Sequence, residues 1–108
     1  MQKNGWIKMA LFEVGLENDF KGGQRKIVDI NGKSVAVIYC DGVIVAFENI
    51  CPHRQGNVGN GEIEDCIITC PLHGWQFDVK TGEGKTMPNS KLNMYPVKVQ
   101  EGKVFVEE

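Results

Sequence analysis

The sequence predicts an all-β protein, an antiparallel β-sandwich or barrel, and three observations support this fold class. Short apolar runs alternate with polar residues at a period of two, which is typical of half-buried strands. Turn dipeptides such as Asn31-Gly32 and Asp41-Gly42 separate these runs. No segment carries a sustained apolar stripe at helical spacing. Many short strands at close intervals indicate a small sandwich or barrel.

The clearest predicted element is a three-stranded meander over residues 26–47. The runs KIVDI, SVAVIYC and VIVAF are rich in β-branched residues, which favour strands. Asn31-Gly32 and Asp41-Gly42 supply the two tight turns between them. Lys26 to Phe47 is therefore expected to fold back on itself twice.

A second hairpin is expected at the C-terminal end. Val97 and Val99 alternate with polar residues, Glu101-Gly102 makes the turn, and Val104 begins the returning run. Further short strands are predicted around Ile63, at 67–68 and at 75–79, and one turn of helix at 16–20.

Composition bounds the function. The chain has 108 residues and a mass of 12.0 kDa, which fits one domain. Twelve basic and 14 acidic residues give a net charge of -2, which disfavours a nucleic-acid partner. The first 15 residues hold charges and no apolar stretch long enough for a signal peptide or membrane span. A cytoplasmic location without a membrane partner is expected.

Two irregular segments interrupt the strand pattern and carry the candidate site. Residues 49–60 read NICPHRQGNVGN and residues 70–74 read CPLHG. Loops of this kind aim side chains from a rigid scaffold. Each contains one cysteine and one histidine, and four cysteines in a chain without secretion signals favour metal or redox chemistry over a disulfide scaffold.

The four candidate ligands are Cys51, His53, Cys70 and His73. They form the pattern C-x-H-x16-C-x2-H, and the chain has no other histidine. Two thiolates and two imidazoles make a four-ligand set for a soft metal. The bland alternative is a pair of buried core cysteines beside solvated histidines.

The pairing of unlike ligands decides between metals. Zinc fingers usually pair Cys with Cys and His with His, whereas each loop here holds one of each. A mixed pair suits a two-iron cluster, because each loop then gives its Cys to one iron and its His to the other. That is the ligation of a Rieske [2Fe-2S] centre. The segments VAFENICPH, ITCPLHGWQFD and YPVKV, and the TGEG turn, resemble the Rieske ferredoxin family.

The resemblance covers roughly residues 11–106 and implies fold, cofactor and organisation. It implies a single Rieske domain over 1–108, with a small cluster-binding subdomain formed by two loops at about 49–90 inserted in a β base domain. It implies one [2Fe-2S] cluster, bound by Cys51, His53, Cys70 and His73. Since both histidines serve as ligands, and no GxGxxG follows a strand, no enzyme active site is expected.

The ligand set also bears on the reduction potential. Two ferric ions, two sulfides and two thiolates sum to zero charge, so one electron is accepted more easily than by an all-cysteine cluster, within roughly -150 to +300 mV. High-potential relatives carry an extra cysteine in each loop and a Ser after the second His. Gly56, Leu72 and Trp75 occupy those places here. The low-potential branch is expected.

The expected role is one-electron carriage by a monomer from a flavin reductase to an oxygenase or similar redox protein. Three alternatives remain: the small subunit of an assimilatory nitrite reductase, a zinc-stabilised structural module, and a redox sensor. The intact ligand set favours the carrier.

Residues around the motif receive weaker predictions. Cys40 and Cys66 are interpreted as small buried hydrophobic side chains, with a redox switch as the alternative. Gly56 and Gly74 are expected to let backbone amides approach the cluster sulfurs. A last group could either face a partner or pack the core beneath the loops: Pro52, Leu72, Trp75, Met87 and Pro88.

Overall fold

The computed structural model describes residues 10–51, 56–72, 74–86 and 89–108. These residues form strands, one α-helix and one 3₁₀ helix at Val58–Asn60. In chain order the other elements are β1 (Leu11–Leu16), α1 (Glu17–Lys21), β2 (Lys26–Ile30), β3 (Lys33–Cys40), β4 (Val43–Glu48), β5 (Glu62–Glu64), β6 (Ile67–Thr69), β7 (Gln76–Asp78), β8 (Met94–Tyr95), β9 (Val97–Gln100) and β10 (Lys103–Glu107). The all-β prediction is confirmed.

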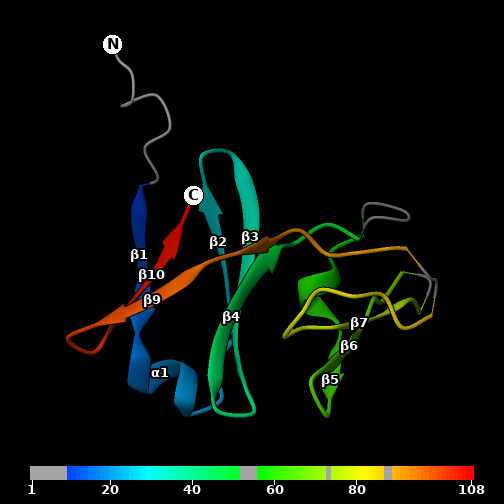
Figure 1. Ribbon diagram of the computed structural model, residues 1–108, viewed down its shortest axis with the longest axis horizontal. Helices are drawn as coiled ribbons and strands as arrows, with labels where there is room; N and C mark the ends of the chain where they lie inside the picture. The colour runs from blue at the N-terminus through cyan, green and yellow to red at the C-terminus, as the bar shows by residue number, and fades with distance from the viewer. Residues whose placement is uncertain (1–9, 52–55, 73, 87–88) are drawn as a thin grey trace.

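The strands form three antiparallel sheets (Figure 1). A central sheet has the order β2-β3-β4-β8, a terminal sheet the order β1-β10-β9, and a third sheet the order β5-β6-β7. In the chain, the third sheet lies between β4 and β8 of the central sheet. The terminal and third sheets lie on opposite sides of the central sheet in the ribbon view.

The central sheet is buried on both faces. Val35, Val37 and Ala46 pack toward the terminal sheet, in one core with Val104 and Val106. Ala36, Ile38 and Phe47 point the other way, into a core with residues of the third sheet. A strand covered on both faces needs no polar face, which explains why VAVI, residues 35–38 of β3, is a continuous apolar run.

The predicted turns have the backbone that their residues favour. Asn31 and Gly32 have φ of 53° and 83°, Asp41 and Gly42 have 52° and 84°, and Glu101 and Gly102 have 52° and 78°. Two successive positive φ values are the mark of a type I′ turn, whose twist matches that of the flanking strands. The meander and the C-terminal hairpin are confirmed.

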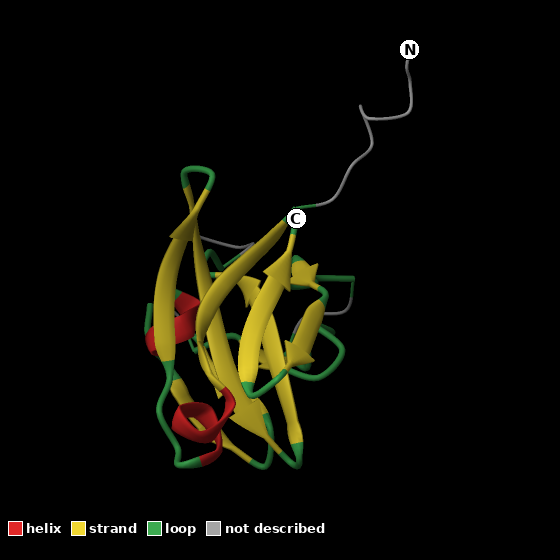
Figure 2. Cartoon of the chain, turned by 90° about the vertical axis from the view of Figure 1, so that its left-hand side faces the viewer, coloured by secondary structure: helices red, strands yellow, loops and turns green. Residues whose placement is uncertain are grey.

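The remaining elements match the sequence less closely. The predicted turn of helix is α1, the lower of the two red helices in Figure 2. Its Phe20 is fully buried in the core between the central and terminal sheets. β1 was not predicted, and it pairs with β10 at the other end of the chain. Nowhere in the described segments is a helix long and apolar enough to cross a bilayer.

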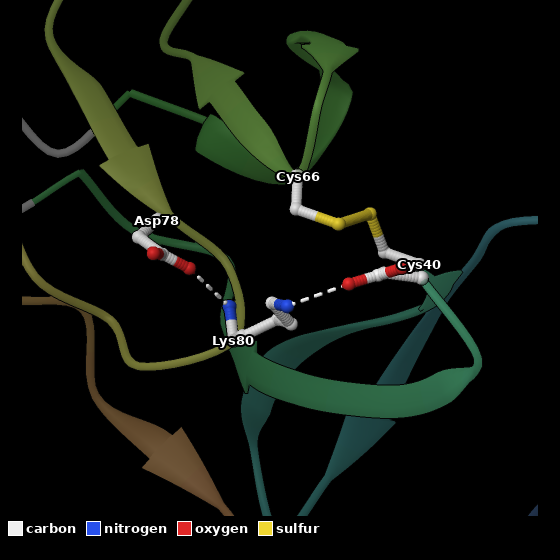
Figure 3. Close-up of a disulfide and its surroundings, with 5 residues drawn as sticks. Cys40, Cys66, Asp78 and Lys80 are labelled. Carbon is white, nitrogen blue, oxygen red and sulfur yellow. Dashed lines mark hydrogen bonds and ion pairs between the residues drawn. A yellow bond between two sulfur atoms is a disulfide. The ribbon is translucent and has the colours of Figure 1, made fainter.

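The interpretation of Cys40 and Cys66 as small buried hydrophobic side chains is incomplete: Cys66 is buried and Cys40 packs against the same core, but the two cysteines are bonded to each other. The two residues form a disulfide with a Cα–Cα distance of 5.9 Å (Figure 3). Cys40 ends β3 of the central sheet, whereas Cys66 lies in the turn between β5 and β6. The pairing could not be predicted from the sequence, because the two cysteines are 26 residues apart and only the packing of the third sheet on the central sheet brings them together.

Candidate metal centre

Two of the four predicted ligands are described, and they lie in the same core. Cys51 follows the end of β4, and Cys70 directly follows β6. Each side chain is 1% exposed, and both belong to the core that includes Phe47 and Phe77. Neither cysteine forms a disulfide. The fold therefore brings these two thiols, which follow strands of different sheets, into one core.

The two ligand loops are closed by equivalent hydrogen bonds. The backbone N–H of Cys51 donates to the carbonyl of Gly56 at 2.8 Å, and that of Cys70 donates to the carbonyl of Trp75 at 2.7 Å. In each loop a cysteine is thus bonded to the residue five positions later. His53 and His73 fall within these closed segments in sequence and lie outside the described residues.

The loops touch each other at Gly56. A Cβ placed on Gly56 would lie 3.0 Å from Leu72 Cβ and 3.3 Å from Cys70 Sγ. A side chain there would push the second loop away from the first. Gly74 needs glycine for a different reason: its φ is +77°, although a Cβ at this position would meet no atom within 4 Å. The expected approach of these amides to cluster sulfurs stays a prediction.

The donor chemistry fits a soft metal centre. Two buried thiols that are not bonded to each other, on contacting loops, supply half of a four-ligand set. The described residues alone hold no group of three or more His, Cys, Asp or Glu that could bind a metal ion. His53 and His73, the other two predicted donors, lie outside the described residues, so the complete ligand set stays a prediction.

The rim of the site is partly apolar. Leu72 is 51% exposed, and it lies against Gly56 of the first loop. Trp75 is half-buried and packs against the core beneath the loops, which favours its structural reading. Pro52, Met87 and Pro88 lie outside the described residues.

Sequence reasoning missed the residues that fix the ends of the first loop. Asn49 and Arg25 both bond to the segment 59–61, which follows that loop. The only signal in the sequence was an Asn two positions before a ligand cysteine, followed by Gly59 and Gly61. That signal does not reveal burial, so it did not single out either residue.

Comparison with known proteins identifies the kind of site. Residues 10–96 match the Rieske [2Fe-2S] domain. The ferredoxin component of the naphthalene 1,2-dioxygenase/salicylate 5-hydroxylase systems of a Ralstonia species is 35% identical over 94% of each chain.

Solved structures share the fold. A chain in the complex of reduced oxygenase and oxidised ferredoxin of carbazole 1,9a-dioxygenase superposes with a TM-score of 0.79, at 29% identity, over 88% of this chain and 99% of that one. A Mycobacterium tuberculosis protein assigned as an NADH-dependent nitrite reductase small subunit gives a TM-score of 0.82 at 20% identity, over 94% of this chain and 96% of that one. At that identity the second likeness shows the fold alone.

The chain combines antiparallel sheets with two contacting loops that each carry a cysteine. Together with the match to an iron–sulfur domain and to a ferredoxin component, this defines an iron–sulfur electron carrier. The chain belongs to the Rieske [2Fe-2S] domain family. It carries one Rieske [2Fe-2S] cluster, transfers electrons and is not itself a catalytic enzyme. The zinc-module alternative is thereby set aside.

Proposed function

We propose that this protein carries single electrons from a flavin reductase to the oxygenase component of a multicomponent dioxygenase system. The ferredoxin relative at 35% identity is a component of such systems, and the carbazole ferredoxin has been solved in complex with its oxygenase. The alternative role is that of a nitrite reductase small subunit. The likeness to such a subunit does not favour it over the role of oxygenase ferredoxin, because that likeness extends to the fold alone.

The cluster ligands in this proposal are Cys51, His53, Cys70 and His73, within a cluster-binding subdomain at about 49–90 of a single domain. One observation carries the assignment: the two loops have the same cysteine-to-i+5 hydrogen bond and contact each other at Gly56. Equivalent loops facing each other are what a two-iron centre with one Cys and one His from each loop requires.

The chain's own residues set the conditions for electron transfer. When bound, the cluster supplies a one-electron redox couple. The burial of Cys51 and Cys70 keeps water from the thiolates, and the exposed Leu72 leaves an apolar contact at the rim for a docking partner. Gly56 and Leu72 stand where high-potential relatives have the two cysteines of a loop disulfide, and Trp75 stands where they have a Ser hydroxyl donor, so the potential is expected toward the low end of the Rieske range.

The ligand assignment is tested by low-temperature EPR of the dithionite-reduced protein purified without air. Wild type should give a rhombic signal with an average g below that of all-cysteine clusters, with two irons per chain expected from the cluster stoichiometry. His53→Ala and His73→Ala should lose this signal or the cluster itself. Cys40→Ser is the matched control for Cys51→Ser and Cys70→Ser, and should keep the signal. An unchanged spectrum in His73→Ala would overturn the assignment.

The partner assignment is tested by reconstitution. The cluster-loaded protein should elute as a free monomer on gel filtration. Mixed with a flavin reductase and a Rieske oxygenase, it should support turnover of the oxygenase substrate. Stable co-elution with a nitrite reductase catalytic chain, without oxygenase turnover, would favour the other role.

A further inference from the structure

Asn49 has an unusual environment for a polar residue. It is 4% exposed and is the one buried polar side chain within residues 10–51, 56–72, 74–86 and 89–108. Its Oδ1 accepts a hydrogen bond from the backbone N–H of Gly59 at 2.6 Å, and its Nδ2 donates to Ser34 Oγ at 3.2 Å. Its backbone N–H donates to the Ser34 carbonyl at 2.7 Å. A buried amide is tolerated because its hydrogen bonds are made.

These bonds connect the two ends of the first ligand loop. Asn49 lies two positions before Cys51, and Gly59 lies in the 3₁₀ helix that follows the loop. The Asn49 end is anchored to Ser34 of β3 in the central sheet, and the Gly59 end is held to it through the Asn49 side chain. Glycine is required at the far end, because a Cβ on Gly59 would lie 2.8 Å from Asn49 Oδ1 and 2.7 Å from Ala36 Cβ.

Arg25 holds the same segment from another direction. Its Nη1 donates to the carbonyls of Gly59 and Gly61, each at 2.7 Å. These carbonyls lie at the end of the 3₁₀ helix, where backbone acceptors lack partners within the helix. A cationic donor makes such bonds stronger than a neutral one does. Arg25 therefore ties the segment just before β2 to residues 34 and 36 positions away.

The anchored segment also contacts the second ligand loop. A Cβ on Gly61 would overlap the carbonyl oxygen of Thr69, the residue directly before Cys70. The backbones at Gly61 and Thr69 are thus as close as glycine permits. Fixing residues 59–61 in space consequently fixes the first loop relative to Cys70.

We propose that Asn49 and Arg25 are positioning residues that hold the two ligand loops at the spacing required by the cluster. The inference rests on the proposed ligand set, since it assigns Cys51 and His53 to the first loop and Cys70 and His73 to the second. A four-ligand centre tolerates only small displacements of its ligands. Loss of a residue that orients metal ligands typically weakens metal binding about 10–100-fold.

The test measures cluster release from the loaded protein, followed by visible absorbance in the presence of an iron chelator. Asn49→Ala should release its cluster about 10–100-fold faster than wild type, with a changed EPR line shape. Asn49→Asp keeps an oxygen acceptor for the Gly59 N–H and for the Ser34 hydroxyl, and should restore most of the lifetime. Arg25→Met should accelerate release, whereas Arg25→Lys, which keeps a cationic donor, should do so less.

Val106→Ala is the matched control, because Val106 is fully buried in the core on the opposite face of the central sheet. It should lower the melting temperature without changing the EPR line shape or the release rate. The proposal is overturned if Asn49→Ala and Arg25→Met release the cluster at the wild-type rate, or no faster than Val106→Ala at equal loss of stability. Should Asn49→Ala fail to fold, Arg25→Met compared with Arg25→Lys gives the same decision, because Arg25 holds the same segment through Gly59 and Gly61.

Failure of the proposed function would look different. A loaded wild-type protein that gives no turnover with reductase and oxygenase would remove the partner assignment. The release rates of the variants would be unaffected by that result.

Discussion

Cys40 and Cys66 join the central sheet to the turn of the third sheet through a disulfide, and Cys66 does so from a left-handed backbone conformation with φ of 63°. Its neighbour Asp65 also has a positive φ, of 54°. Glycine or asparagine would suit this turn better than cysteine. The cross-link explains why a cysteine occupies a position that its backbone disfavours.

Removing this disulfide should lower stability and leave the cluster in place. In the chain-entropy account, a cross-link spanning 26 residues stabilises the folded state by about 3.5 kcal/mol. Cys40→Ala combined with Cys66→Asn removes both thiols and gives the turn a residue that tolerates positive φ. Urea unfolding should show the loss, while absorbance and EPR of the cluster stay unchanged. Loss of the cluster signal in the folded double variant would contradict the expectation.

Beside the disulfide, Asp41 and Lys80 form an ion pair at 2.8 Å (Figure 3). The hydrogen bond from Lys80 lowers the pKa of Asp41, and that same bond raises the pKa of Lys80. Stability contributed through Asp41 is therefore present above its unfolded pKa of 3.8 and is lost as the pH falls through the lower folded value. Stability contributed through Lys80 is complete below pH 10.5 and is lost as the pH rises through its raised pKa.

Removal of the Asp41–Lys80 ion pair should lower the free energy of unfolding slightly, and only over a defined range of pH. The Asp41 side chain is 70% exposed, so solvent screens the interaction. Urea unfolding of wild type and Asp41→Asn should show a small, constant difference from about pH 5 to about pH 9, which shrinks below about pH 4. Glu13→Gln, which removes one negative charge at an exposed position of β1, serves as the charge control. A difference that grows toward acid pH would exclude the pair as its source.

The turns could be predicted from sequence because their chemistry is local. Asn31-Gly32 and Asp41-Gly42 need only their own backbone preferences to form type I′ turns, and both did. β1 escaped prediction because its partner β10 lies at the opposite end of the chain. Two strands that pair across almost the whole chain leave no signal in the short sequence window from which a strand is predicted.

For the candidate site, too, the local features could be predicted from the sequence and the long-range contacts could not. The cysteine and histidine spacing indicates two matched loops, and the structure places Cys51 and Cys70 in one core, while the full ligand set stays a prediction. The supports of the loops depend on contacts between distant segments, such as Arg25 with Gly61 across 36 residues. Composition around Arg25 carries no sign of this contact, so only the folded chain reveals it.

Leu72 should contribute to partner binding and leave the redox couple unchanged. It is 51% exposed at the rim of the loops, and an apolar side chain in the centre of an interface can be worth about 1–2 kcal/mol. Leu72→Ala, which adds no charge beside the cluster loops, should reduce electron transfer to an oxygenase about tenfold at limiting ferredoxin concentration. Val99→Ala is the matched control, since Val99 is 43% exposed on the terminal sheet. Equal losses in both variants, or a shifted potential in Leu72→Ala, would argue against docking through Leu72.

Gly61→Ala should prevent stable cluster binding by steric pressure between the loops. Its φ is not positive, so alanine meets no backbone penalty, but the added methyl would overlap the Thr69 carbonyl oxygen. Relief requires residues 59–61 and the strand leading to Cys70 to separate, at about 1–3 kcal/mol for overpacking of this kind. Gly32→Ala is the opposite case: φ is +83° and nothing lies within 4 Å, so it costs about 1–2 kcal/mol of backbone strain alone. With comparable losses of stability, iron content per chain should fall in Gly61→Ala and stay at the wild-type value in Gly32→Ala. Equal iron content in the two variants would mean that the contact between Gly61 and Thr69 does not control the spacing of the loops.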